Sequence, residues 1–150
     1  MTSRVTRSPS ASSPTALRRM QRQRQRDTRP ELALRRAIWG LGLRYRVHIS
    51  PLKGRGKADV VFRRERVAVY LDGCYWHGCP SHGTIPRNNR EWWSNKIETN
   101  RQRDAETQRQ LTEAGWLAIR IWEHEDPVKA AQQIATCVLA RRASLASHKQ

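Results

Sequence analysis

The sequence predicts a mixed α/β domain in which a small sheet is covered by helices. Two apolar runs, 58–62 and 67–72, are joined by the charged stretch 63–66, which indicates a hairpin whose strands are buried on both faces. A long polar stretch at 89–113 is predicted to be helical, and a further apolar run at 116–122 follows it. A buried hairpin followed by a helix and another strand gives a mixed sheet with helices packed against it.

A first helix is predicted to begin at Thr28. The hydroxyl of Thr28 can cap a helix, and Pro30 and Glu31 are residue types that favour a first turn. Apolar residues then recur at helical spacing until Gly40, where the helix is expected to end. A short strand is predicted over 43–49.

A last helix is predicted from the cap at Asp126 and Pro127 to about Arg142. A chain of 150 residues favours one domain with flexible ends. We therefore expect a basic disordered arm, one folded domain and a short disordered tail, at 1–27, 28–142 and 143–150.

The charge predicts a polyanionic partner. Lysine and arginine number 29 against 13 acidic residues, a formal net charge of +16, which suits nucleic acid, a ribosome or an anionic membrane surface. Residues 1–27 are rich in arginine and contain no aromatic residue, so we expect them to be disordered or to order on a partner. A solubilising or targeting tail is the alternative. Without a membrane-spanning run or a secretory signal, a cytoplasmic, nucleoid-associated protein is expected.

Two carboxylates stand at the ends of the predicted hairpin. Asp59 begins one strand and Asp72 ends the next, so a hairpin brings them to one edge of the sheet. Two acids there could bind a hard cation such as Mg²⁺. Basic residues, among them Lys57, precede Asp59. Two solvated acids at strand ends are the alternative.

The long polar helix has one face that carries its few apolar residues. That face is formed by Trp93, Ile97, Asn100, Asp104 and Leu111. If the face points inward, Asp104 needs a partner, and a cationic histidine would suit it. A half-buried face with Asp104 paired to a local arginine is the alternative.

Cysteine and histidine residues cluster between the hairpin and the long helix. Cys74, His77, Cys79 and His82 have short spacings typical of zinc ligands, and His124 is a candidate from elsewhere in the chain. Reduced thiols near unrelated histidines are the alternative. Tyr75 and Trp76 lie inside the same segment, where they could stack on bases or shield a metal site.

Taken together, these residues resemble the very short patch repair (Vsr) endonucleases, which nick DNA beside T:G mismatches. The resemblance covers about residues 18–126, and the segments that carry it are 26–31, 54–62, 72–80, 93–104 and 115–123. Its most specific part is the Gly-Cys-Tyr-Trp-His run that starts at Gly73. The family implies a restriction-endonuclease-like αβββαβ core, which agrees with the element order predicted above.

The resemblance also implies the roles of individual residues. Asp59 matches the family's Mg²⁺-binding aspartate, and the position of Leu71 matches one whose backbone carbonyl completes the metal site. His77 matches the catalytic histidine, Asp104 the acid that orients it, and Glu31 an acid near the site. Asp72, where some members carry histidine, is left open as a second Mg²⁺ ligand.

Two further groups are implied by the resemblance. A structural Zn²⁺ would be held by Cys74, Cys79, His82 and His124. A wedge that enters the duplex would consist of Tyr75, Trp76 and Trp93. The charge pattern adds basic residues that are expected to hold DNA: Arg22, Arg24, Arg26 and Lys57.

The expected partner is double-stranded DNA with a T:G mismatch, bound by a monomer. Other mismatch-repair proteins are further candidate partners, and no membrane is expected. Two other functions stay open: a non-catalytic, zinc-stabilised DNA-binding protein, and a restriction-type nuclease without mismatch specificity. Mismatch-dependent nicking in Mg²⁺ would separate them.

Overall fold

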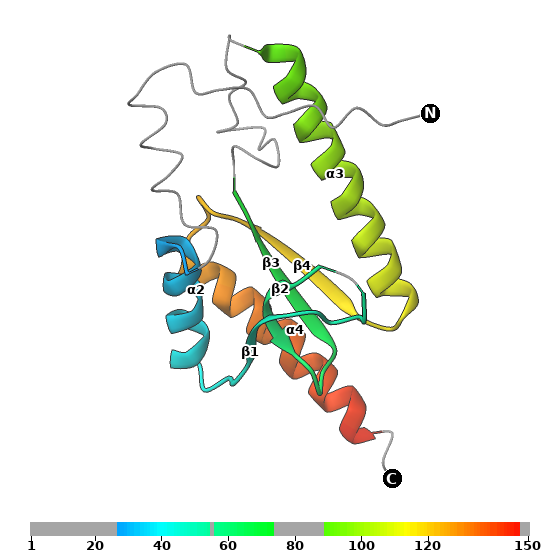
Figure 1. Cartoon of the computed structure of the whole chain (residues 1–150). Coiled ribbons are helices and arrows are strands. Elements are labelled where there is room, and N and C mark those ends of the chain that lie inside the picture. Colours follow the sequence, from blue (N-terminus) through cyan, green and yellow to red (C-terminus); the bar gives the residue numbers. More distant parts are fainter. Residues whose placement is uncertain (1–26, 55, 74–88, 148–150) are drawn as a thin grey trace.

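A four-stranded sheet organises the fold (Figure 1). Its strands lie in the order β1 (Arg46–Ile49), β2 (Ala58–Phe62), β3 (Val67–Asp72) and β4 (Leu117–Trp122). The first three strands pair antiparallel, whereas β3 and β4 pair parallel, so the sheet is mixed as predicted. The computed structural model describes residues 27–54, 56–73 and 89–147.

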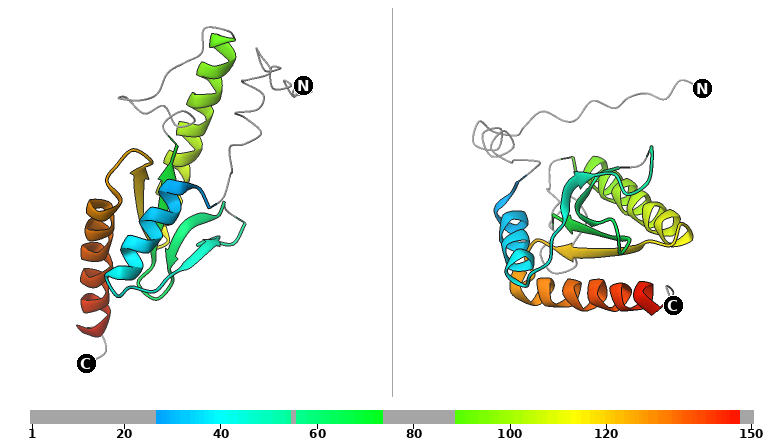
Figure 2. Two further views of the ribbon diagram at one scale, coloured as in Figure 1. Left: turned by 90° about the vertical axis from the view of Figure 1, so that its left-hand side faces the viewer. Right: turned by 90° about the horizontal axis from the view of Figure 1, so that it is seen from below.

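Within the described residues, three helices cover the two faces of the sheet. They are α2 (Arg29–Gly40), α3 (Arg90–Glu113) and α4 (Pro127–Ser147). One core cluster joins α2 and α4 to the sheet through residues such as Ile38, Ile134 and Phe62. A smaller cluster joins Leu111 of α3 to Val61 and other sheet residues. Figure 2 shows α3 on the side of the sheet opposite α4.

The predicted cap of the first helix is confirmed. The backbone N–H of Glu31 donates to the Thr28 hydroxyl, and the N–H of Thr28 donates to the Glu31 carboxylate, both at 3.4 Å. This reciprocal pair satisfies two backbone donors that a helix start otherwise leaves unpaired. It also fixes the side chain of Glu31 at the N-terminus of α2.

The last helix is longer than predicted. Residues 143–147 continue α4 beyond Arg142, where the helix was expected to give way to a tail. This stretch contains alanine and leucine and no glycine or proline, so nothing in it stops the helix. Arg142 also pairs with the buried carboxylate of Glu65 at 3.0 Å, which holds this end of α4 against the hairpin turn.

Element boundaries otherwise agree closely with the prediction. β2 and β3 have the predicted bounds. β1 starts later than predicted, at Arg46, and Leu43, at the predicted start, is buried in the core ahead of the strand. On α3, Trp93, Ile97 and Leu111 are buried, which confirms the predicted inward face. Within the described ranges, no helix has the length and apolar character needed to cross a membrane.

Candidate functional site

Asp59 is bonded to the neighbouring strand through its side chain. Its Oδ2 accepts a hydrogen bond of 2.7 Å from the backbone N–H of Leu71 on β3. The register that pairs Val60 with Val69 explains this contact, because it sets Asp59 beside the stretch that ends β3. The structure therefore brings together the two residues that the resemblance implies for a metal site.

The surroundings of Asp59 disfavour its negative charge. Burial raises the pKa of the Asp59 carboxyl, and the charges of Glu31 and Asp72 raise it further, while the Leu71 N–H and His48 lower it. No described lysine or arginine forms an ion pair with Asp59. The partly buried carboxylate of Asp59 suits Mg²⁺, which takes oxygen ligands, whereas the two acids near it, Glu31 and Asp72, are each paired with an arginine. The residues present thus fit such a cation.

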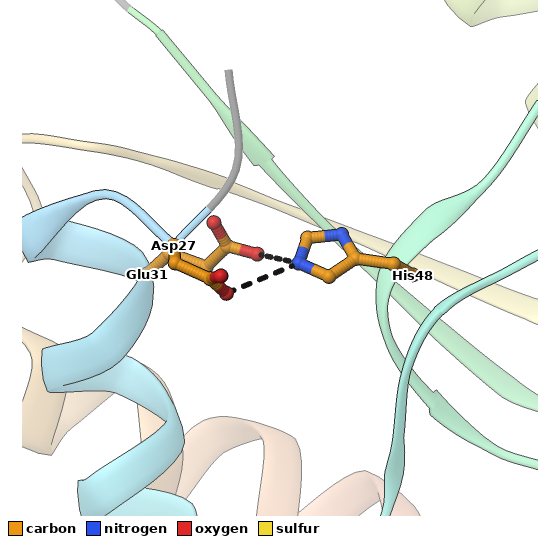
Figure 3. A group of neighbouring side chains, drawn as sticks. All are labelled: Asp27, Glu31 and His48. Atoms are coloured by element: carbon orange, nitrogen blue, oxygen red, sulfur yellow. Dashed lines mark ion pairs between the residues drawn. The ribbon is translucent and has the colours of Figure 1, made fainter. Parts of the chain in front are cut away.

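A second polar cluster lies at the start of α2 (Figure 3), close enough to Asp59 for the charges of Glu31 and His48 to affect its pKa. Nε2 of His48 lies 3.0 Å from the Glu31 carboxylate and 3.5 Å from that of Asp27. One ligand atom from each of the three residues lies within 4.8 Å of the others. Glu31 is only 3% exposed, so its charge needs a partner inside the protein.

Arg35 supplies that partner. Its Nη2 lies 2.7 Å from the carboxylates of both Asp27 and Glu31, and 3.0 Å from Nε2 of His48. The guanidinium therefore occupies the position that a cation bound by these three groups would take. We interpret the cluster as an internally neutralised support for Glu31, and we assign no metal to it.

His48 has an unusual backbone conformation for a strand residue. Its φ is +50°, in the left-handed region that side-chain-bearing residues seldom adopt. Its neighbours Val47 and Ile49 pair with Val60 and Ala58, which places His48 opposite Asp59. Sequence reasoning missed both His48 and Arg35. A lone histidine in a predicted strand was the available signal, but only the fold shows its contacts.

Arg120 connects two of the predicted site carboxylates. Its Nη1 lies 2.7 Å from Oδ1 of Asp72, and its Nη2 lies 3.2 Å from Oδ1 of Asp104. Asp104 thus has a cationic partner, as expected for an inward-facing acid. Arg120 of β4 is its partner among the described residues, as in the alternative of pairing with an arginine, whereas the expected contact with His77 lies outside them.

Only some of the remaining predicted site residues lie within the described part of the chain. His124 follows β4, and its ring stacks on that of Trp122 with centroids 6.5 Å apart. Trp93 is 9% exposed and packs edge-on against Trp92, while Lys57 is exposed before β2. The other candidates lie outside the described residues: His77, Cys74, Cys79, His82, Tyr75, Trp76, Arg22, Arg24 and Arg26.

Comparison with known sequences points to one family of nucleases. A family model described as DNA mismatch endonuclease Vsr matches residues 13–82. Type II nicking enzyme V.NaeI of Lentzea aerocolonigenes is 46% identical over 112 residues, which are 73% of this chain and 68% of that protein. DNA mismatch endonuclease Vsr of Escherichia coli (strain K12) is 34% identical over 99 residues, which are 65% of this chain and 62% of that protein.

Two further comparisons also point to nucleases. Type II nicking enzyme V.NmeDIP of Neisseria meningitidis serogroup C is 41% identical over 108 residues, covering 71% of this chain and 72% of that protein. Among solved structures, the Homing Endonuclease I-Bth0305I Catalytic Domain has a TM-score of 0.51 and 18% identity, and the match covers 77% of this chain and 98% of that one. At that identity the structural likeness concerns the fold, a mixed α/β architecture shared with an endonuclease.

Proposed function

Because the chain belongs to the Vsr family of DNA mismatch endonucleases, and is thus a DNA endonuclease, we propose that it nicks one strand of duplex DNA beside a T:G mismatch in Mg²⁺. Such mismatches arise when 5-methylcytosine is deaminated. The net charge of +16 supports a DNA substrate, because the phosphate backbone attracts lysine and arginine.

The observation that carries the proposal is the setting of Asp59. Its half-buried carboxylate is bonded to the N–H of Leu71, and two other acids lie close enough to raise its pKa. In our proposal, Asp59 and the carbonyl of Leu71 hold Mg²⁺, with Glu31 beside them. The cation would polarise the scissile phosphate and stabilise the leaving oxygen.

His77 and Asp104 act on the attacking water in this proposal. His77 positions the water or takes its proton, and Asp104 orients the imidazole. Asp104 suits that role because it projects from α3 toward the same face of the sheet as Asp72, to which Arg120 links it.

The remaining predicted residues bind DNA or stabilise the fold in this proposal. Zn²⁺ is held by Cys74, Cys79, His82 and His124, because thiolate and imidazole are ligands that zinc prefers. Tyr75 and Trp76 form the wedge that opens the base stack, at a cost that is lowest at a mismatch, whereas Trp93, expected in the same wedge, is buried on the inward face of α3. The basic arm at 1–27, with Arg22, Arg24 and Arg26, contacts phosphates together with Lys57, ahead of an endonuclease domain at 28–142.

A second candidate function is nicking that does not require a mismatch. Two of the relatives described above carry the name Type II nicking enzyme, which favours considering it. The two candidates differ in substrate only, since both use the same nuclease centre.

The deciding experiment compares duplexes that differ at one base pair. Wild-type protein is incubated in Mg²⁺ with a T:G duplex and with its matched T:A and C:G counterparts, in a panel of flanking sequences. Faster nicking of the T:G duplex supports mismatch repair. Equal nicking of all three supports the second candidate, and binding without nicking contradicts both.

A further inference from the structure

Arg120 is a charged residue in an otherwise apolar strand. β4 reads Leu-Ala-Ile-Arg-Ile-Trp, and Arg120 pairs in register with Tyr70 of β3. Its side chain is only 20% exposed. A guanidinium in this position must be compensated by partners within the protein.

Three groups from two other elements surround this guanidinium. Asp72 of β3 lies 2.7 Å from Nη1, and Asp104 of α3 lies 3.2 Å from Nη2. The guanidinium carbon lies 4.5 Å from the centre of the Tyr70 ring. A planar guanidinium can direct separate N–H groups at two acceptors while its face packs on a ring, which a lysine ammonium cannot reproduce.

The contact has a consequence for Asp72. Its carboxylate is buried and already faces a cation, so a metal ion would have to compete with Arg120 for it. Asp59 differs, because no described lysine or arginine forms an ion pair with it. The two carboxylates at this end of the hairpin therefore have different partners.

We propose that Arg120 is a positioning residue of the nuclease centre. It fixes Asp104 of α3 against the end of β3, and Asp72 serves to hold Arg120 rather than a metal ion. This inference rests on the proposed function, because it assigns Asp104 to the reaction. It adds a residue that neither the sequence motifs nor the resemblance had identified.

The test combines four variants with one matched control. Arg120→Met removes the bridge, and Arg120→Lys keeps the positive charge without the planar guanidinium. Asp72→Asn keeps an oxygen acceptor but removes the charge, and the double variant Arg120→Met with Asp72→Asn removes both charges. Arg109→Met is the control, since Arg109 also contacts two carboxylates of α3, Glu106 and Glu113, but on its exposed side. For each protein we would measure the single-turnover nicking rate, the Mg²⁺ concentration that gives half the maximal rate, and the DNA affinity in Ca²⁺. The midpoint of urea unfolding would be measured with and without Mg²⁺.

We expect Arg120→Met to slow single-turnover nicking by about 10- to 100-fold, because a misplaced catalytic group costs rate rather than substrate binding. DNA affinity should stay at the wild-type value. Arg120→Lys should recover only part of the rate. Asp72→Asn should leave both the half-maximal Mg²⁺ concentration and the Mg²⁺-induced shift of the urea midpoint unchanged.

The double variant separates a loss of stability from a loss of catalytic positioning. Arg120→Met alone takes the cation away from the buried carboxylate of Asp72 and should lower the urea midpoint, whereas Asp72→Asn combined with it should restore the midpoint. Nicking should stay slow in the double variant, because Asp104 still lacks its anchor. Restoration of the wild-type rate would mean that Arg120 only neutralises Asp72, and would overturn the positioning role.

Two other results contradict the proposal. A rise of about tenfold or more in the half-maximal Mg²⁺ concentration of Asp72→Asn would make Asp72 a metal ligand. A wild-type rate for Arg120→Met would show that the bridge is not needed. Nicking by the wild-type protein tests the proposed function. If the wild-type protein does not nick DNA, that function is overturned, and with it any role of Arg120 in the reaction. If the wild-type protein nicks DNA and Arg120→Met does so equally fast, only the role of the bridge is overturned.

Discussion

The carboxylate of Asp59 on β2 accepts a hydrogen bond of 2.7 Å from the backbone N–H of Leu71 on β3. A backbone donor of the sheet is thus used to hold a side chain. The carboxylate is thereby fixed by two strands rather than by a loop, and rigid elements hold a site more precisely than loops do. This contact sets the position of the proposed metal site.

Replacing Asp59 with asparagine should stabilise the folded protein at neutral pH. The pKa of Asp59 is raised, chiefly by burial, so its carboxyl group favours the folded state while it is protonated. That contribution is lost as the pH rises from the usual value of 3.8 through the raised pKa. Urea unfolding of wild type and Asp59→Asn should therefore give a difference at pH 7 that shrinks toward pH 4. A wild type that is the more stable at pH 7, without metal, would contradict this.

Removing Arg35 should destabilise the start of α2. The buried carboxylate of Glu31 would lose its cation, and breaking one side of a buried pair costs about 3 kcal/mol. We expect Arg35→Met to lower the free energy of unfolding by roughly that amount, measured by urea denaturation. Adding Glu31→Gln should recover most of the loss. No recovery in the double variant would show that the cost comes from packing instead.

The strands and the inward face of α3 could be predicted because they depend on local patterns. Apolar runs gave the bounds of β2 and β3, and helical spacing gave the buried positions of α3. The partners of the site acids could not be predicted in this way. Asp72 and Arg120 are 48 residues apart, and their contact depends on the parallel pairing of β3 with β4.

Sequence reasoning also missed Arg120, although a signal for it existed. A single arginine inside an apolar strand is costly unless it is paired, which is a reason to look for a buried polar contact at that position. His48 stood out only as a lone histidine in a predicted strand, and Arg35 carried no comparable signal. Their contact with Glu31 depends on how β1 lies against α2, which local periodicity does not encode.

Arg141 of α4 should contribute strongly to stability. Its guanidinium donates to the backbone carbonyls of Glu65, Arg66 and Gly115, at 3.1 to 3.4 Å. It therefore joins the hairpin turn and the end of α3 to the last helix. Hydrogen bonds from a charged group contribute about 1.5 to 3 kcal/mol, so Arg141→Ala should lower the free energy of unfolding by about 2 kcal/mol. Lys129→Ala, at an exposed position of the same helix, is the control and should change it little.

The proposed zinc site makes a prediction about metal content. Purified protein should contain about one Zn²⁺ per chain, because four thiolate and imidazole ligands form one closed site. His124→Ala should release zinc to a chelator faster than wild type and should lower the unfolding temperature. Well-folded wild-type protein without zinc would rule out the site. Unchanged zinc release by the variant would remove His124 from the ligand set.

The most direct test of the nuclease centre is the single-turnover nicking rate of Asp59→Asn on a T:G duplex in Mg²⁺. Asparagine keeps an oxygen that can accept the Leu71 hydrogen bond, so the fold should be retained. Loss of the metal-binding charge should slow nicking by about a thousandfold or more, since the cation supplies several kcal/mol of transition-state stabilisation. DNA affinity measured in the same preparation should be preserved. Nicking by Asp59→Asn at the wild-type rate would contradict the account.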